Sequence, residues 1–307
     1  MFDDNDIRRV AAALLTNECY VEKDWHLVRA LSIIARIQMN GVTPVFSGGT
    51  SLSTAHQLIR RFSEGIDFKV IVDAGDPKTL AAARRTFRDE VVKHLQAAAF
   101  VMDGEPVIAN ASRFFRASFH YGPRFPEAAG IRPTLQVEMT FEGTKRLPQQ
   151  RAAHSLLSRS LRRASEIDAL ACVDPIETAA DKVSALAWRV AKRDRSQAND
   201  DPAVIRHLHD LAALAPLVAE NEEFRDLARE VLTEDAARAR MPGITGNTLL
   251  ARMLPTISND ALWQREYERL VGAVSFGKDD ERITFDRAVD ACSGLVRDIQ
   301  KGWPETS

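Results

Sequence analysis

A glycine-rich turn between an apolar run and an acidic strand most restricts how this chain can fold. Residues 46–70 read FSGGTSLSTAHQLIRRFSEGIDFKV. The pattern predicts a short strand at 43–46, a turn at 48–51, a helix at 51–61 and a second strand at 66–72. A glycine turn at the start of a helix offers backbone N–H groups to phosphate oxygens. The order therefore predicts a phosphate-binding turn beside a strand that carries carboxylates.

The composition of the 307 residues is typical of a globular protein with two domains. Hydrophobic residues make up 45% of the chain and charged residues 27%. The formal net charge of −2 excludes a protein that binds nucleic acid by charge alone. The three cysteines (19, 172 and 292) form no CxxC pair, which argues against a disulfide framework or a zinc knuckle and favours a reducing compartment.

Targeting segments are not expected in this chain. The start, MFDDNDIRRV, is acidic and lacks the apolar core of a signal peptide. A membrane-spanning helix needs roughly 18 or more consecutive apolar residues, and the sequence has no such run. We therefore expect a cytoplasmic protein that does not contact a membrane.

Residues 1–170 alternate between helical and strand patterns, which predicts a mixed sheet with flanking helices. The other expected helices span residues 5–17, 24–39 and 77–98. The other expected strands span residues 99–108, 112–121 and 133–142. Gly41 is expected to end the second helix as a left-handed cap. The polar segment 147–161 is interpreted as a connection that leaves room for one more short strand.

Residues 171–307 show helical periodicity almost throughout. The expected helices lie near residues 175–193, 202–219, 221–237, 258–275 and 282–301. Breaks are expected at 199–202, 241–246, Pro255 and 277–280. The predicted fold class is therefore α+β, with a mixed β-sheet domain over 1–170 followed by a C-terminal helical bundle over 171–307.

Acidic residues on the strands supply the candidate chemistry. Gly65 and Asp67 lie on the same face of their strand because side chains alternate. Glu138 lies on a later strand, in LQVEMTF. Carboxylates of this kind hold the magnesium that phosphoryl transfer requires. The simpler interpretations stay open: any junction of strand and helix can use Gly-Gly, and Glu138 also suits a solvated face.

Four segments resemble the AbiEii/AbiGii family of nucleotidyltransferase toxins, and one of them is LQVEMTF at 135–141, where Glu138 matches the family's third acidic residue. The family pattern Arg-x-Ser-Glu-Asp-Ile-Asp is similar to RFSEGID at 61–67, with Gly65 in place of the first metal-binding Asp. ETAADKVSALAWR at 177–189 resembles the family's Ala-x-Lys-x-x-Ala-Leu segment. AVIRHLHDLAAL at 203–214 resembles its Arg-Asp-x-x-Asp-Leu segment.

The resemblance implies a toxin of a type IV toxin–antitoxin or abortive-infection (phage-defence) system. Such a toxin would bind a nucleoside triphosphate with Mg²⁺ and transfer a nucleotide to an RNA acceptor, the 3′ end of tRNA. A cognate antitoxin encoded nearby would neutralise it.

The resemblance also assigns roles to individual residues. It implies that Lys182 neutralises phosphate charge and that Asp210 orients or activates the acceptor. Arg61 lies beside the site or pairs with Glu64. The implied nucleotide-binding residues are Gly48, Gly49, Thr50, Ser51, Ser63 and Lys182, the implied metal ligands are Asp67, Glu64 and Glu138, and the implied catalytic residues are Asp67, Lys182 and Asp210.

Gly65 keeps other functions open. Either Glu64 or Glu138 compensates for the missing carboxylate, or the protein is a catalytically silent nucleotide-binding module. A purely structural or interaction protein is the third hypothesis, in which Gly48 and Lys182 tolerate substitution. His207 and His209 are two residues apart on a helix, point to different sides and are not expected to share a metal ion.

Overall fold

A computed structural model describes residues 3–73, 75–126, 128, 132, 134–198, 200–238, 243–277 and 282–304. The chain divides into two compact units. The first, the sheet unit, consists of Met1–Asp174 and Phe276–Lys278, and the second, the helical unit, consists of Pro175–Ser275 and Asp279–Ser307. The boundary expected at 170/171 falls inside β7 (Ile167–Cys172), a strand that belongs to the sheet.

The sheet unit is built on a mixed sheet, in which the described residues form seven strands in the order β3-β4-β5-β2-β1-β7-β6. The remaining strands are β1 (Val42–Ser47), β2 (Gly65–Val72), β3 (Val101–Ala109), β4 (Phe114–His120), β5 (Thr134–Thr140) and β6 (Gln149–Ala153). β2 pairs with β5 and β1 with β7 in parallel, and the other pairs are antiparallel. The predicted α+β class is confirmed.

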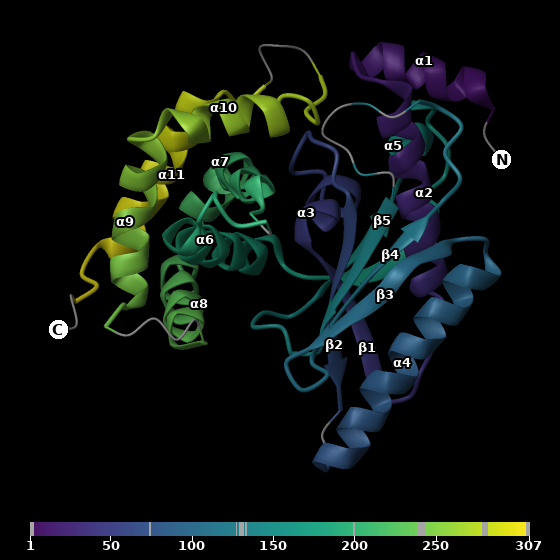
Figure 1. Cartoon of the computed structure of the whole chain (residues 1–307), viewed down its shortest axis with the longest axis horizontal. Coiled ribbons are helices and arrows are strands. Elements are labelled where there is room, and N and C mark those ends of the chain that lie inside the picture. Colours follow the sequence, from purple (N-terminus) through teal and green to yellow (C-terminus); the bar gives the residue numbers. More distant parts are fainter. Residues whose placement is uncertain are drawn as a thin grey trace. The chain divides into compact units, whose positions relative to one another are not determined.

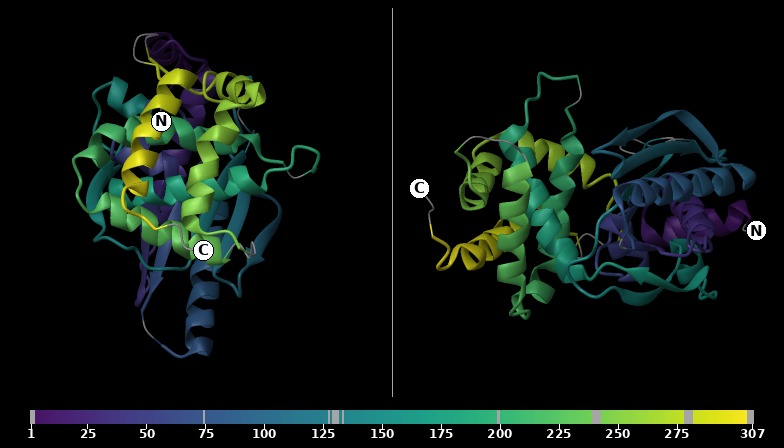
Figure 2. Two further views of the ribbon diagram at one scale, coloured as in Figure 1. Left: turned by 90° about the vertical axis from the view of Figure 1, so that its left-hand side faces the viewer. Right: turned by 90° about the horizontal axis from the view of Figure 1, so that it is seen from below.

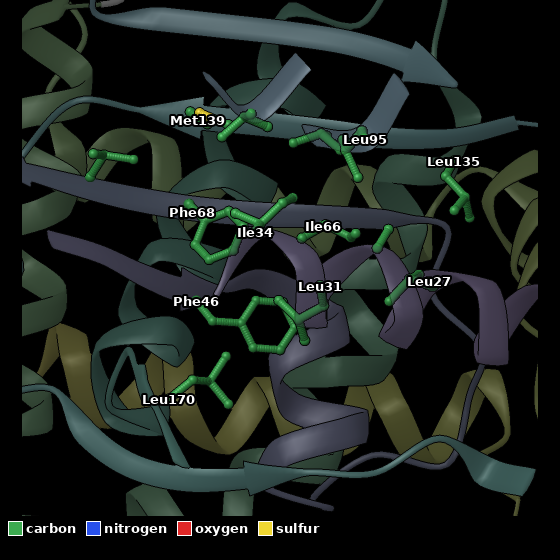
Figure 3. Close-up of a cluster of buried hydrophobic side chains, with 14 of the residues drawn as sticks. Leu27, Leu31, Ile34, Phe46, Ile66, Phe68, Leu95, Leu135, Met139 and Leu170 are labelled. Atoms are coloured by element: carbon green, nitrogen blue, oxygen red, sulfur yellow. The ribbon is translucent and has the colours of Figure 1, made fainter. Parts of the chain in front are cut away.

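Helices pack on this sheet and bury its core (Figure 1). They are α2 (Glu18–Ile34) and α4 (Pro77–Ala97). The other helices of the sheet unit are α1 (Asp4–Leu14), α3 (Gly48–Thr50) and α5 (Leu156–Ser160). Figure 3 shows the core, where Leu31 and Ile34 of α2 meet Phe46, Phe68 and Met139 of the central strands. Apolar burial of this kind is the main force that holds helices against a sheet.

The helix expected over 51–61 is wrong in length. After α3, only Ser51–Ala55 stays helical, as one π-helical turn. The hydroxyls of Ser53 and Thr54 donate to the carbonyl of Thr50 at 3.1 and 2.8 Å, and such side-chain bonds compete with regular helix. Gln57 then takes a left-handed φ of 57°, which ends the turn.

Three other expectations need correction. α2 ends at Ile34, so Gly41 does not cap it; its φ of +74° instead serves a turn closed by a bridge between Met39 and Val42. β7 was not predicted, because a six-residue strand in a polar context gives little pattern. Helix α9 (Gly246–Ser258) was also missed, because Pro255, taken as a break, lies inside it.

The helical unit is a bundle around α6 (Pro175–Lys192), which packs against three of its other helices (Figures 1 and 2). The other elements are η2 (Pro202–Ile205), α7 (Arg206–Ala219), α8 (Phe224–Arg238), α9, α10 (Ala261–Leu270) and α11 (Phe285–Gln300). Among the described helices of the whole chain, none has the length and apolar character to cross a bilayer.

Candidate functional site

The turn after β1 is shaped by a carboxylate of the neighbouring strand. The antiparallel register of β1 and β2 places Ser47 opposite Asp67. Gly48 has φ +74°, a left-handed conformation that glycine adopts without strain. A Cβ atom added to Gly48 would lie 2.0 Å from Oδ2 of Asp67. Only glycine at this position lets the Asp67 carboxylate lie directly against the turn.

A buried arginine lies under the second glycine. A Cβ atom on Gly49 would meet Nη2 of Arg61 at 2.8 Å and Oγ of Ser63 at 3.2 Å. Arg61 is 4% exposed, and its Nη1 donates to the carbonyl of Phe62 at 3.0 Å. Ser63 is therefore beside the turn, as expected, together with a cation that the sequence left without a firm role.

The two hydroxyl residues of the turn point into the protein. Thr50 and Ser51 are each buried. The Thr50 hydroxyl donates to the carbonyl of Gly65, which ties the turn to the first residue of β2. We infer that the turn offers a phosphate its backbone N–H groups, and that Thr50 positions β2.

Asp67 and Glu138 are brought together by strand pairing. The parallel register of β2 and β5 makes them direct partners, and both are half-buried. Directly paired residues point to the same face of a sheet, with Cβ atoms about 5 Å apart. Two carboxylates at this spacing favour a cation between them. This arrangement agrees with the predicted place of Glu138.

Gly65 leaves space on the same face. A Cβ atom there would lie 3.4 Å from the carbonyl oxygen of Gln136 and 3.8 Å from Oδ1 of Asp67. Both distances are ordinary van der Waals contacts, so the site can accommodate a side chain at position 65. A carboxylate at position 65 would point toward the Asp67–Glu138 pair.

Glu64 is engaged elsewhere. Its Oε2 accepts the N–H of Arg132 at 2.8 Å and lies 3.5 Å from Nζ of Lys23. Lys23 is 1% exposed and donates to the carbonyl of Arg132 at 2.6 Å. This network joins α2 to the chain that enters β2 and β5. In the part of the chain that the structure describes, no three His, Cys, Asp or Glu residues gather as a metal-binding group.

The helical unit brings together its two predicted site residues. Nζ of Lys182 on α6 lies 2.7 Å from Oδ2 of Asp210 on α7, with the side chains 7% and 0% exposed. Nδ1 of His209 lies 3.3 Å from the other oxygen of Asp210. The sequence treated His209 as incidental; its contact depends on side-chain rotamers that spacing does not encode. The result is a buried ion pair with a histidine beside it.

The residues of the sheet site fit a divalent cation. Mg²⁺ prefers oxygen ligands and is held by one or two carboxylates together with substrate phosphates and water. Asp67 and Glu138 supply two carboxylates, and the adjoining glycine turn lies against Asp67. This minimum set needs the phosphates of a bound nucleotide to complete the coordination.

Comparison with known proteins agrees with this geometry. A family model described as nucleotidyl transferase AbiEii toxin, type IV TA system, matches residues 40–291. Enzymes of this class generally use a divalent metal. Among solved structures, the chain is similar to MenT4, the nucleotidyltransferase toxin Rv2826c from Mycobacterium tuberculosis H37Rv. The two are 15% identical, with a TM-score of 0.61 over 99% of this chain and 91% of that one, which shows a shared fold. No curated protein matches the chain.

Proposed function

This chain belongs to the AbiEii family of nucleotidyltransferase toxins of type IV toxin–antitoxin systems, and we propose that it transfers a nucleotide to RNA with Mg²⁺. The donor is a nucleoside triphosphate, the acceptor is the 3′ end of tRNA, and a cognate antitoxin encoded nearby counters the damage. The observation that carries the proposal is the pairing of Asp67 with Glu138 beside a turn whose first glycine makes room for Asp67.

The reaction is a displacement at the α-phosphorus. The acceptor hydroxyl oxygen forms a bond to that phosphorus, the bond to the bridging oxygen breaks, and pyrophosphate leaves with the electron pair. A bound metal ion would neutralise charge on the phosphates. The N–H groups at Gly48 and Gly49 bind and orient the phosphates. Asp67 and Glu138 would hold the cation, and Gly65 leaves that set one carboxylate short.

In this proposal the helical unit contributes a cation and a proton acceptor. Lys182 is proposed to neutralise phosphate charge, and Asp210 to orient the acceptor hydroxyl or take its proton. Their mutual distance of 2.7 Å supports a joint role, because each fixes the position of the other's charge. His209, against the second oxygen of Asp210, restricts the carboxylate further.

Gly65 favours a second function, a nucleotide-binding module without transfer activity. In that case nucleotide binding depends little on Mg²⁺, because the site holds the phosphates through the turn alone. The two functions differ in one measurable property, the transfer of label from the nucleotide to RNA.

The experiment compares three proteins: the natural chain, Gly65→Asp and Gly65→Asn. Each is incubated with total tRNA, Mg²⁺ and one of the four α-labelled nucleoside triphosphates. Asn matches Asp in size without its charge, so a gain seen only with Asp reports a metal ligand. Binding of the same nucleotides is measured with and without Mg²⁺.

Labelled tRNA from the natural chain is the expected result, with faster labelling by Gly65→Asp. Labelling by Gly65→Asp alone would support the silent binding module. No labelling by any of the three would overturn transfer to tRNA, and nucleotide binding would then decide between another acceptor and a non-enzymatic protein.

A further inference from the structure

The helical unit contains a pocket that the proposed transfer chemistry does not use. Its volume is about 520 Å³. It is lined by the last turns of α6, the loop that follows, and the start of η2. Trp188, Arg189 and Lys192 form the α6 wall. The pocket is thus defined by residues of one compact unit and is large enough for a nucleobase and its sugar.

The α6 wall combines one aromatic ring with two cations. Trp188 is half-buried, whereas Arg189 and Lys192 are exposed. Cζ of Arg189 lies 5.5 Å from the Trp188 ring centroid, and Nζ of Lys192 lies 5.8 Å from it. An indole face flanked by exposed cations is the combination by which proteins hold single-stranded nucleic acid.

The acidic residues of the loop wall accept hydrogen bonds from other residues of the loop and of η2. Asp200 accepts from Nε and Nη2 of Arg193 at 2.7 and 2.8 Å. Asp194 accepts from the backbone and hydroxyl of Ser196 and from Gln197, and these hydrogen bonds lower its pKa to about 2. Asp201 begins η2 by accepting from the N–H of residue 203 at 3.1 Å. Each of these carboxylates holds part of the loop in place through hydrogen bonds.

The loop wall is also anchored to α10. Arg193 donates to Glu266 at 2.6 and 2.8 Å, and its guanidinium lies 4.4 Å from the ring centroid of Trp263. Arg195 lies 4.9 Å from the same ring and donates to Asp260 at 2.7 Å. Bidentate arginine contacts of this kind hold geometry well. The pocket is therefore formed before any ligand arrives.

We propose that this pocket binds one nucleotide of a single-stranded RNA, with the base stacked on Trp188 and backbone phosphates held by Arg189 and Lys192. The inference rests on the proposed function in taking RNA as the acceptor. Trp188 follows Lys182 by six residues on α6, which is about 9 Å along the helix axis. One helix thus carries both the cation of the transfer motif and the aromatic contact for RNA.

The test measures binding of a short fluorescent single-stranded RNA of mixed sequence to the full chain, without nucleoside triphosphate. We expect Trp188→Ala to weaken binding by roughly 5- to 150-fold, the loss of one stacked base. Trp188→Phe is expected to keep most of the affinity. In the double variant Arg189→Gln/Lys192→Gln, the slope of log affinity against log salt should fall by about 1.4, the loss of two phosphate contacts.

The chain offers matched controls. Trp303 pairs with Arg229 at 5.7 Å, outside the pocket, so Trp303→Ala removes the same kind of ring from the same unit. Arg252 is exposed on α9, so Arg252→Gln removes a charge elsewhere. Both controls should bind the RNA as the natural chain does. Thermal unfolding of every variant separates lost contacts from lost folding.

The outcomes separate this inference from the proposed function. Unchanged RNA affinity in Trp188→Ala and an unchanged salt slope in the double variant would overturn the proposal that the pocket binds RNA, even if tRNA is labelled normally. Trp188-dependent binding without any labelling would support the pocket and count against transfer. Equal binding of double-stranded RNA would overturn base stacking, and a peptide that competes for the pocket would point to a protein partner.

Discussion

The sheet unit and the helical unit each hold one motif carboxylate, and they hold it in opposite ways. Asp67 is half-buried, lies against a glycine turn and is paired across the strands with a second carboxylate, Glu138. Asp210 is fully buried and lies 2.7 Å from the ammonium of Lys182. The first arrangement gathers negative charge near solvent, and the second neutralises it in the interior.

Because of this difference, the loss of Asp67 and the loss of Asp210 should affect the protein in different ways. Asp67 and Glu138 are half-buried on one face of the sheet, so removing one should affect ligand binding more than folding. A buried ion pair depends on both partners, so removing one leaves an uncompensated charge in the interior. Substitution of Asp67 or Glu138 should therefore change activity at constant stability, and substitution of Lys182 or Asp210 should change stability first.

The largest effect is expected from Lys182→Met. It leaves the Asp210 carboxylate buried without its ammonium partner, and breaking a buried pair in this way costs about 3–5 kcal/mol. Urea unfolding followed by circular dichroism measures the loss in the free energy of unfolding. A loss below about 1 kcal/mol would show that the pair is not what holds α6 and α7 together.

The double variant Lys182→Met/Asp210→Leu is the control. Replacing both partners by apolar residues of similar size is often neutral for folding, so most of the stability should return. A folded double variant without transfer activity would assign Lys182 and Asp210 to the reaction. Full activity would show that the pair is structural and that only the sheet unit supplies catalytic residues.

The next largest effect is expected from Asp67→Asn. Loss of a carboxylate that holds the cation should slow nucleotide transfer by roughly 10²- to 10³-fold, a few kcal/mol in the barrier. The free energy of unfolding should change by less than about 1 kcal/mol, because the residue is half-buried and Asn has the same shape. Single-turnover labelling and Mn²⁺ binding followed by EPR measure the two consequences. Unchanged Mn²⁺ affinity would contradict the site.

Asp24, a buried carboxylate of the sheet unit, should make the free energy of unfolding depend on pH. Burial raises the pKa of Asp24 from 3.8 to about 7, more than the hydrogen bond from the Leu156 N–H and the charge of Arg159 lower it. Between about pH 4 and pH 7 the folded state therefore holds a proton that the unfolded state has lost. The free energy of unfolding should fall across this range by up to about 1.4 kcal/mol per pH unit.

Asp24→Asn should remove that slope and keep the acceptor for the Leu156 N–H. Urea unfolding at a series of pH values, compared between the two proteins, measures the difference. Parallel curves from pH 4 to 7 would show that Asp24 is ionised throughout, and that burial in this unit does not raise its pKa.

The sequence predicted the parts that depend on local order. The strand 66–72, the helix 175–193 and the pairing of Glu138 with the first acidic strand all follow from periodicity and family motif, and the structure has β2, α6 and the Asp67–Glu138 register there. The helix predicted to start at residue 77 does start there, and the side chain of Asp76 caps it. These features are encoded by residues close together in the chain.

The missed features depend on hydrogen bonds that apolar periodicity does not show. Glu64 looked like a metal ligand beside Asp67, but its oxygen accepts from Arg132, 68 residues later, and lies near Lys23 on α2. The helix over 51–61 failed because Thr50 accepts bonds from two hydroxyls, which periodicity ignores. A tertiary hydrogen bond decided the position of Glu64, and local side-chain bonds decided the length of the helix; apolar periodicity displays neither.

The smallest and most discriminating effect is expected from alanine at two glycines of the sheet site. Gly48→Ala places a Cβ atom 2.0 Å from Asp67 Oδ2 at a left-handed φ, which should cost roughly 1–2 kcal/mol of stability and push the carboxylate away. At Gly65 the nearest atom is 3.4 Å away, so Gly65→Ala should keep its stability within about 1 kcal/mol. Mn²⁺ affinity should fall in Gly48→Ala and hold in Gly65→Ala. Equal affinities in the two variants would mean that the turn does not set the position of Asp67, and the contrast between an open site and a buried pair would lose its structural basis.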